Sequence, residues 1–532
     1  MNSFSGKIWR PLTIFLVCLA TYLVTSYGGI RSPDGEMVFL TAQSLAESAS
    51  FALGKTSSWS AFGHARGKNG RNYSLFGPGE SILLAPFAAA GEIINRSGWY
   101  KSQDIYIPPS HYLDKGLHDF LLGQRPRIME PHALRFLASP FNAIISALGS
   151  VIFFFILSRL GYSPAVSTPV TYLYAFGTLA WPYSGTFFSE PLATLMVLLS
   201  FFLLIPAPNQ EKGIPADPVA LIFSGLALGA GTATHITAIL FFPFFWLLSS
   251  GIHYPSRTHK RTLFRASLPF CVGYSIPTAL IAIFNYSRFG SVIETGRTVN
   301  SVDPSAFDYV QFTLPFEGLY GLTLSSGKGL LFYSPAVIAG LLAWRYFHRR
   351  NSYLSVVLLS AISLRVLFIA GQKDWYGGFS LGPRYLVMVI PFLLIPIAEW
   401  LKNSLADADK KSIGLFLAIT AASISQQIYF SVGEIFSFFH IAKIPWQNTL
   451  IDWNKILYFE WDLSPLLHLH EGFRGPYILQ FVPISNMMIW AGGTLMAVFA
   501  SVWYYFKVVQ RLQDKPPCLP RDDGTGSSLY ST

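Results

Sequence analysis

The stretch RSPDGEMVFLTAQSLAE, residues 31–47, follows an apolar run at about 11–29. This run is long enough to cross a bilayer, because a spanning helix needs about 20 apolar residues. Lys7 and Arg10 precede it and no A-x-A cleavage motif follows it, so we expect a retained first helix with its N-terminus inside. Asp34 and Glu36 then lie where the chain leaves the membrane. The apolar spacing in residues 35–50 predicts a helix lying on the membrane surface.

The composition places the chain among polytopic membrane proteins. Of its 532 residues, 52% are hydrophobic and only 12% are charged, whereas soluble proteins carry about 25% charged residues. The net charge of +10 comes from basic residues clustered in short segments between apolar runs, which indicates membrane topology rather than binding to nucleic acid. The three cysteines, Cys18, Cys271 and Cys518, support neither a disulfide framework nor a zinc site.

Apolar runs predict an all-α integral membrane protein with roughly twelve spanning helices. The second apolar stretch, 80–95, is left out of this count, and residues 218–252 could form one kinked helix. Residues 1–510 form a single membrane domain in this interpretation, and 511–532 form a disordered cytoplasmic tail. The predicted spans are 11–29, 134–158, 164–185, 189–207, 218–234, 236–252, 267–288, 329–347, 353–371, 384–401, 412–432 and 486–508.

Three segments between these spans are long: about 30–133, 289–328 and 433–485. Loops of such length usually carry function, and we expect them outside, with interfacial helices on the membrane surface. The short loops assigned inside are basic, as in the segment from Arg257 to Arg265, and this agrees with the positive-inside rule. Both termini are then cytoplasmic, and we expect the bacterial cytoplasmic membrane.

Asp34 has two interpretations from the local sequence. It could cap the surface helix, with Glu36 stabilising the helix dipole. Alternatively, it could be a general base at the membrane surface, where partial desolvation raises a carboxyl pKa.

A resemblance to a known family bears on this choice. The stretch from Arg31 to Glu47 resembles the first outer loop of the GT-C superfamily, membrane glycosyltransferases that use polyprenyl-phosphate sugars, such as protein O-mannosyltransferases and lipid A aminoarabinose transferases. Five further stretches are similar to bacterial members and occur in the same order between matching spans. They are YSLFGPGESILLAPFAAAG (73–91), FFSEPLATLMVLLSFFLL (187–204), FNYSRFGSVIETG (284–296), GKGLLFYSP (327–335) and WYGGFSLGPRYLVMVIPFL (375–393).

The resemblance implies that Asp34 is the catalytic base and that Glu190 faces the active-site cavity. Many members have Asp-Glu after the first span, whereas Gly35 intervenes here before Glu36. His235 stands where relatives often have Arg or Lys, and from its neighbours it is interpreted as a hydrogen-bonded structural residue.

Basic residues near the predicted outer face are candidates for binding the donor phosphate. Arg384 follows Pro383, which suits a first helical position, so its guanidinium, the helix dipole and free N–H groups could converge on an anion. Alternatively, Arg384 could be an interfacial anchor whose side chain extends to the lipid headgroups. Lys373 and Arg365 could assist, although Arg365, about two turns inside its span, could instead snorkel outward.

The expected function is therefore an inverting glycosyltransferase that moves a sugar from a polyprenyl-phosphate donor to an acceptor glycan, lipid or protein on the outer, periplasmic face. No cofactor is required by any motif, but Asp34, Glu36 and Glu190 could gather a divalent cation. The rivals are a transporter or flippase for lipid-linked sugars, a membrane polysaccharide polymerase, and a non-catalytic relative that acts as a scaffold.

Overall fold

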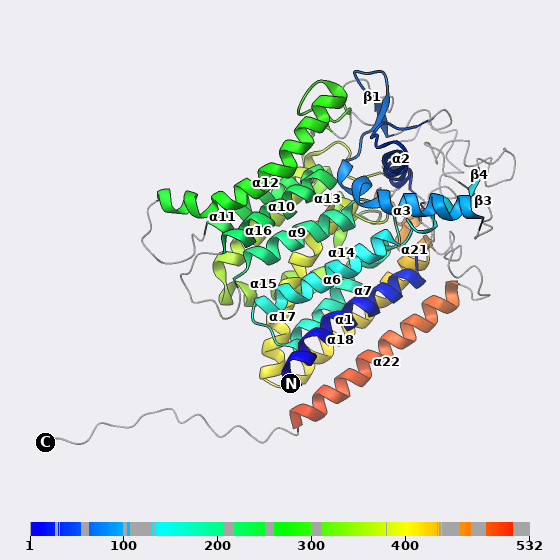
Figure 1. The fold of residues 1–532 in the computed structure, drawn as a ribbon. Helices are drawn as coiled ribbons and strands as arrows, with labels where there is room; N and C mark the ends of the chain where they lie inside the picture. Colours follow the sequence, from blue (N-terminus) through cyan, green and yellow to red (C-terminus); the bar gives the residue numbers. More distant parts are fainter. Residues whose placement is uncertain are drawn as a thin grey trace.

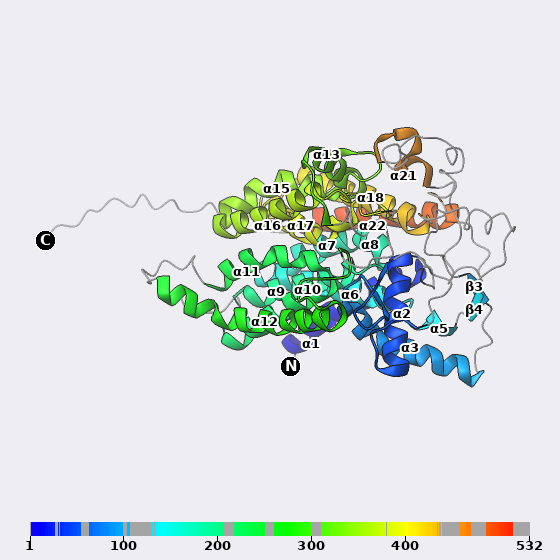
Figure 2. The ribbon, with the colours of Figure 1, turned by 90° about the horizontal axis from the view of Figure 1, so that it is seen from above.

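The computed structural model describes most of the chain as a bundle of helices that run side by side (Figure 1). One end of the bundle carries α2 (Pro33–Ser48), α3 (Pro78–Ser97) and two short two-stranded sheets, as the view from above also shows (Figure 2). The described residues are 2–26, 30, 32–54, 63–98, 104–106, 129–131, 133–206, 217–250, 260–298, 310–378, 380–433, 435, 438, 458–469 and 486–513.

The first half of the chain supplies one side of the bundle and the hairpins. In chain order, its elements are α1 (Asn2–Val24), α2 (Pro33–Ser48), β1 (His64–Arg66), β2 (Asn72–Ser74), α3 (Pro78–Ser97), β3 (Asp104–Tyr106), β4 (Met129–Pro131), α5 (Ala133–Phe136), α6 (Phe141–Arg159), α7 (Pro164–Phe176), α8 (Ala180–Ser184), α9 (Glu190–Leu204), α10 (Pro218–Thr234), the 3₁₀ helix η1 (Ile236–Phe241), α11 (Phe242–Ser249) and α12 (Lys260–Phe289).

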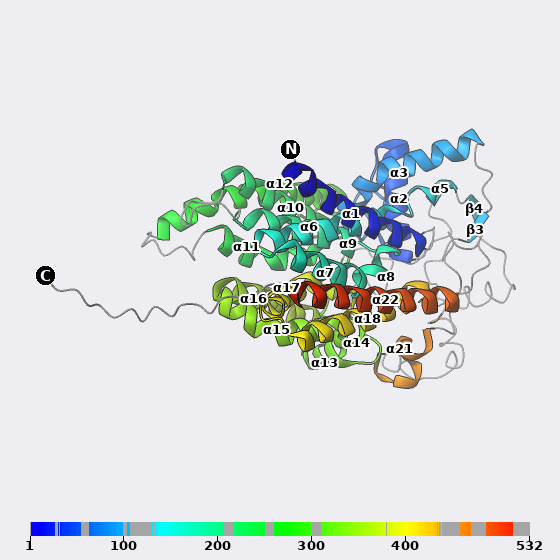
Figure 3. The ribbon, with the colours of Figure 1, turned by 90° about the horizontal axis from the view of Figure 1, so that it is seen from below.

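The second half completes the bundle, and its last helix, α22, packs along α18 (Figure 3). Its elements are α13 (Phe316–Leu324), α14 (Leu330–Tyr333), α15 (Ala336–Arg350), α16 (Ser352–Gly371), η3 (Arg384–Val389), α17 (Ile390–Ala406), α18 (Lys410–Val432), η5 (Trp461–Leu463), α21 (Pro465–His468) and α22 (Asn486–Gln513).

Helix starts follow from short polar side chains that satisfy free backbone N–H groups. Asp217 accepts from the N–H of Val219 at the start of α10, and Asn351 accepts from that of Leu354 at the start of α16. Asp409 does the same at the start of α18, where its carboxylate accepts from two N–H groups.

Burial separates the centre of the bundle from its rim. In the most apolar window of the segment Arg384–Ala406, which contains α17, 89% of the residues are buried, against 17% in that of α12. Exposed apolar side chains follow one stripe of α12 at helical spacing, at Leu268, Val272, Ile276 and Leu280. Such a stripe suits a helix that faces lipid, and α17 suits the protein core.

A helix occupies each of the twelve predicted spans, but the count of twelve is not confirmed. Among the described residues, five helical segments are long and apolar enough to cross a membrane, and this makes the chain a multi-pass membrane protein. Other predicted spans are interrupted: residues 164–185 break at Gly177 into α7 and α8, and 329–347 break near Pro335. The five segments are Phe141–Arg159, Ala266–Phe289, Ser352–Gly371, Arg384–Ala406 and Lys410–Val432.

The first long loop differs from the predicted all-α chain. It contains two short antiparallel hairpins, β1 with β2 and β3 with β4. The stretch 80–95, which was left out of the spans, lies in α3 and is not among the five span candidates. Much of the predicted outer loops 289–328 and 433–485, and the tail from 514 onward, lies outside the described residues.

The predicted surface helix exists as α2, but its burial differs from the prediction. Val38 and Phe39 are buried together with Met37 and Ala42, so the first half of α2 is enclosed rather than amphipathic. Only its last turn, including Ala49 beyond it, is exposed. The reason is that α2 packs against α3 and against the segment before α9, where it is covered on more than one side.

Candidate functional site

The cap of α2 is Ser32, not Asp34. The Ser32 hydroxyl accepts from the N–H of Gly35 at 3.1 Å, and Pro33 occupies the first helical turn. The interpretation of Asp34 as the helix cap is therefore wrong. Its carboxylate is left for a contact outside the helix, and its side chain is 17% exposed.

That contact is with Arg384, 350 positions later in the chain. Arg384 Nη1 donates to Asp34 Oδ2 at 2.7 Å, and Arg384 Nε lies 3.7 Å from Glu190 Oε1. The guanidinium also stacks over the rings of Phe188 and Tyr385, at 4.8 and 4.9 Å from their centroids. Arg384 Nε is buried and has no hydrogen-bond partner among the described residues. The arginine thus lies between two acids with donor capacity to spare.

Glu190 begins α9, as the sequence predicted, and is almost fully buried. His235 Nε2 lies 3.8 Å from Glu190 Oε1, while its Nδ1 is 2.8 Å from the Thr237 hydroxyl. His235 forms the C-cap of α10 and is buried, in line with its interpretation as a hydrogen-bonded residue. Its Nε2 atom nevertheless faces Glu190.

Close packing brings α2 to the segment that precedes α9. A Cβ atom on Gly35 would lie 2.5 Å from the carbonyl oxygen of Phe187, so only glycine allows this approach. The Ser32 hydroxyl donates to the same carbonyl at 3.3 Å. The Gly35 that separates Asp34 from Glu36 in this chain is therefore the residue that lets Asp34 reach the start of α9.

The loop from Asp374 to Pro383 leads into Arg384, and two residues, Gly377 and Lys328, support its conformation. Gly377 has a φ of +66°, and a Cβ there would lie 2.9 Å from Arg384 Nε. Lys328, which is fully buried, donates from Nζ to the carbonyl oxygens of Gly378 and Ser380 at 2.9 and 2.6 Å. Its ammonium group therefore holds the loop beside the arginine.

Asp374 joins the same network through a hydroxyl group. Tyr385 Oη donates to Asp374 Oδ2 at 3.3 Å, and Arg384 Nη2 donates to Tyr385 Oη at 3.3 Å. Burial raises the pKa of Asp374 to about 6, against the opposing influence of the Arg384 and Arg297 charges. The acid at the start of this loop thus has a pKa well above that of an ordinary aspartate.

Arg365 and Lys373, the predicted assistants at the phosphate, are placed very differently. Arg365 is fully buried and donates to the carbonyl oxygens of Tyr385, at 3.0 and 2.8 Å, and of Thr237, at 2.9 Å. It does not snorkel outward but links the two 3₁₀ helices η1 and η3. Lys373 has an exposed side chain in the loop before Arg384.

Pro383 and Arg384 do not begin a regular α-helix. Pro383 is the N-cap of η3, a 3₁₀ helix of six residues, and α17 follows only at Ile390. The predicted converging dipole of a long α-helix is therefore absent at Arg384. The guanidinium itself, rather than the helix terminus, is the anion-binding group that the geometry offers.

Glu36 lies away from this cluster. It forms a fully buried ion pair with Arg135, whose Nε donates to Glu36 Oε2 at 3.0 Å and whose Nη2 contacts the other oxygen. The Arg135 guanidinium also lies 4.7 Å from the centroid of the Phe39 ring. Glu36 thus fixes α2 to α5, and Asp34 alone of the two acids enters the site.

The predicted gathering of Asp34, Glu36 and Glu190 around a cation is not seen. Glu36 is held by Arg135, and Arg384 lies between Asp34 and Glu190. Among the described residues, no three His, Cys, Asp or Glu side chains are grouped as metal ligands.

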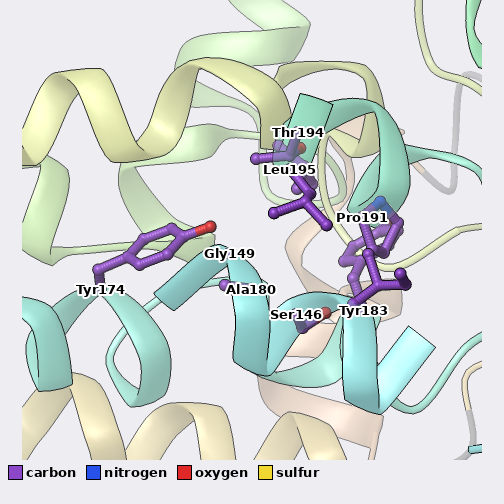
Figure 4. A pocket seen from close by; sticks show the side chains of 10 residues that line it. Ser146, Gly149, Tyr174, Ala180, Tyr183, Pro191, Thr194 and Leu195 are labelled. Carbon is purple, nitrogen blue, oxygen red and sulfur yellow. The ribbon is translucent and has the colours of Figure 1, made fainter. Parts of the chain in front are cut away.

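A small cavity lies between α6, α7, α8, α9 and η3, and Pro191, the residue after Glu190, is part of its lining (Figure 4). Its lining is apolar apart from a few hydroxyl groups. No lining residue is charged, so the cavity suits apolar contents and the charged cluster at its rim remains the candidate site. The lining residues are Ile145, Ser146, Gly149, Tyr174, Ala180, Tyr183, Pro191, Thr194, Leu195 and Val387.

Sequence reasoning missed three buried polar groups around the site. Lys328 lies in the GKGLLFYSP stretch and Asp374 in the loop next to Lys373, but neither was singled out. Glu80 lies in GPGES, fully buried. For Lys328, the available signal was a charged residue between two glycines inside an apolar segment.

Comparisons with known proteins return structural likeness only, since no family model and no curated protein matches the sequence. The apo oligosaccharyltransferase of Archaeoglobus fulgidus matches with a TM-score of 0.49 and 11% identity, over 88% of this chain and 61% of that one. ArnT from Cupriavidus metallidurans bound to undecaprenyl phosphate matches with a TM-score of 0.44 and 12% identity, over 95% of this chain and 78% of that one.

The donor-bound protein O-mannosyltransferase complex Pmt1-Pmt2 of S. cerevisiae matches more weakly, with a TM-score of 0.33 and 12% identity over 58% of this chain and 36% of that one. This chain is thus similar in fold to solved structures of an oligosaccharyltransferase, of ArnT and of a protein O-mannosyltransferase complex. It spans about three fifths of the archaeal enzyme's length. Identities this low concern the fold alone, so function has to be argued from the site.

Proposed function

We propose that this chain is an inverting membrane glycosyltransferase that takes a sugar from a polyprenyl-phosphate donor and passes it to an acceptor outside the cytoplasm. The observation that carries the proposal is the contact of Asp34 with Arg384 at 2.7 Å, with Glu190 on the other side of the guanidinium. A base candidate and a phosphate-binding candidate, predicted independently from distant parts of the chain, thus meet at one point.

Arg384 has the chemistry of a phosphate ligand. Its buried Nε lacks a hydrogen-bond partner among the described residues, and a guanidinium can bind two phosphate oxygens at once. In the proposed reaction, a phosphate oxygen of the donor takes the place of the Asp34 carboxylate on Arg384. The buried Glu190 keeps the arginine oriented from the other side.

Asp34, released from the arginine, accepts the proton of the acceptor hydroxyl or amine. The acceptor atom forms its bond to the anomeric carbon while the bond from that carbon to the phosphate oxygen breaks. The electron pair leaves with the polyprenyl phosphate, whose growing charge Arg384 stabilises. A positioned base of this kind contributes about 10²–10⁴ to the rate.

The apolar surroundings suit a lipid-linked donor. The cavity below the cluster has no charged lining, and the exposed stripe of α12 suits contact with hydrocarbon. Lys373 on the exposed loop is proposed to assist at the phosphate, and Arg365 is proposed to act indirectly by holding η3. The Walker and dinucleotide motifs that bind nucleotides do not occur in the sequence.

The decisive experiment offers the purified protein a panel of radiolabelled polyprenyl-phosphate sugars, with and without a membrane glycolipid fraction as acceptor. We expect release of polyprenyl phosphate and transfer of label with at least one sugar, and neither with the Asp34→Asn protein. Donor binding without cleavage across the whole panel would instead favour a transporter of lipid-linked sugars.

A further inference from the structure

Glu80 is a buried acid that the proposed mechanism does not use. It lies in the first turn of α3 with 0% exposure, and neither of its carboxyl oxygens has a hydrogen-bond partner among the described residues. An unpartnered buried polar group is costly, so its retention needs an explanation.

The start of α3 is held so tightly that Glu80 cannot turn toward water. A Cβ atom on Gly77 would lie 2.2 Å from the carbonyl oxygen of Ala233, and one on Gly79 would lie 2.5 Å from the Thr234 hydroxyl. On the other side, the Ser81 hydroxyl donates to the carbonyl of Val38 in α2 at 3.0 Å. Glu80 is therefore fixed between the end of α10 and the start of α2.

Asn142 of α6 lies beside Glu80, within reach of its carboxyl group. Its amide nitrogen donates to the carbonyl oxygens of Thr186 and Phe188, at 3.0 and 2.8 Å. Both amide hydrogens are thereby used, and turning the amide over would place its oxygen against two carbonyls. Asn142 Oδ1 is buried without a hydrogen-bond partner in the described part of the chain, so Asn142 can offer Glu80 only an acceptor.

The hydrogen-bonding groups around Glu80 determine which protonation state of its carboxyl group fits. A carboxylate only accepts hydrogen bonds, whereas a carboxylic acid has one O–H to donate. Burial, with a smaller effect from the negative charge of Glu190, raises the pKa of Glu80 to about 8 against the opposing influence of the neighbouring Asn142 side chain. The charged or titratable groups on the elements around this turn include Glu190 of α9, His235 at the end of α10, Asp34 of α2, and the paired Glu36 and Arg135 of α2 and α5.

We propose that Glu80 is a positioning residue that works as a neutral acid: its hydroxyl donates to Asn142 Oδ1, and Asn142 holds the segment 186–189 in place. That segment places Phe188 under the Arg384 guanidinium and leads directly into Glu190. The role at the site rests on the proposed glycosyltransferase function, whereas the protonation of Glu80 does not.

Loss of the proton has two consequences at the same place. Asn142 Oδ1 loses its donor, and a second negative charge appears beside the buried Glu190. Turnover should therefore fall on the alkaline side, with a midpoint near pH 8, where Glu80 ionises. In Glu80→Gln the amide N–H still donates to Asn142 Oδ1 and no charge can form, so this alkaline loss should be absent.

The test combines infrared difference spectroscopy with pH profiles of turnover. The spectrum of the parent minus Glu80→Gln should contain a carboxylic acid band at neutral pH that disappears near pH 8, whether or not any sugar donor is turned over. The matched control is Glu92→Gln, which removes an acid from the surface of the same helix, where it pairs with Arg96. The decrease of turnover at alkaline pH should be the same in Glu92→Gln as in the parent.

Two results would overturn the proposal. Absence of the acid band at neutral pH would mean that Glu80 is ionised. An unchanged alkaline limb in Glu80→Gln would mean that its proton does not govern the site. If the band is present but no donor is ever cleaved, the protonation of Glu80 stands and the glycosyltransferase assignment fails.

Discussion

At the end of the bundle opposite the candidate site, both oxygens of Glu399 accept from cations, with Arg350 Nη1 at 2.6 Å and Lys402 Nζ at 3.1 Å. Arg350 also donates to the carbonyl of Leu160 at 2.6 Å and lies 4.5 Å from the centroid of the Tyr162 ring. At the site end, by contrast, Arg384 Nε and both oxygens of Glu80 lack hydrogen-bond partners among the described residues.

The two ends therefore use charge for different purposes. The Glu399 carboxylate pairs with Arg350 of α15 and with Lys402 of its own helix, α17. Both cations remain partly in water, with Arg350 30% and Lys402 46% exposed. The Arg384 cluster is more deeply buried and keeps donor capacity in reserve, which costs stability and is expected where a charged ligand completes the network. Substitutions at the two ends should separate function from stability.

The largest effect is expected from Asp34→Asn. Asparagine keeps an oxygen that can accept from Arg384, and the helix cap is Ser32, so folding should change little. Turnover should fall at least about 10²-fold because the amide cannot take a proton. The measurement is the initial rate of release of polyprenyl phosphate.

Glu47→Gln is the matched control for Asp34→Asn, since it removes an exposed carboxylate from the same helix, where it contacts only Gln43 in the described structure. It should keep the parent's turnover. An active Asp34→Asn enzyme, or an equal loss in Glu47→Gln, would refute the assignment of Asp34 as the base.

Glu36→Gln should act on stability instead. It leaves Arg135 buried without a counter-charge, which costs about 3–5 kcal/mol when one partner of a buried pair is removed. Thermal unfolding in detergent measures this loss, and a second change, Arg135→Met, should recover much of it. If Glu36→Gln keeps its stability but loses turnover, Glu36 belongs to the reaction after all.

This pair of acids also shows how far the sequence could be interpreted. The apolar runs located a helix in each predicted span, whereas the placement of the loop around Asp34 on the outer side stays a prediction. Asp34 and Glu36 lie two residues apart, yet they face Arg384 and Arg135, which are 350 and 99 positions away. Contacts at such separations are set by tertiary packing and leave no local pattern, so the role of Glu36 was not predicted. The cap at Ser32 is local, and a serine directly before Pro33 was the available signal.

The interior charges were the other difficulty. Arg365 was recognised as unusual for a spanning segment, but its partners are backbone carbonyls of two 3₁₀ helices, which no periodicity reveals. Lys328 similarly donates to carbonyls of a glycine-rich loop. Residue type predicted that such groups need partners. The backbone that supplies the partners appears only in the fold.

Arg384→Ala should weaken donor binding by about 1.5–3 kcal/mol, because a charge-assisted contact to phosphate is lost. Arg384→Lys should recover only part, since lysine cannot bind two phosphate oxygens through a planar fork. Binding of a radiolabelled polyprenyl-phosphate sugar to purified protein measures both changes. Unchanged affinity in both variants would leave Arg384 as a structural partner of Asp34 and Glu190.

The smallest effect is expected at the opposite end, in Glu399→Gln. The amide keeps the shape of the side chain and can still accept from Arg350, and both cations can turn to water because they are partly exposed. Because both cations stay partly solvated although the Glu399 carboxylate is buried, the free energy of unfolding in detergent should fall by only about 1 kcal/mol, less than in Glu36→Gln.

Turnover and donor affinity of Glu399→Gln should equal those of the parent. In the described structure, the Glu399 carboxylate accepts hydrogen bonds from Arg350 of α15 and from Lys402 of its own helix, α17, and both lie away from the candidate site. A loss of turnover comparable to that of Asp34→Asn would show that the two ends of the bundle are coupled. In that case the contrast between a closed charge cluster and an open one would no longer separate stability from function. We expect the contrast to hold, because no described hydrogen bond links Glu399 to the Arg384 cluster.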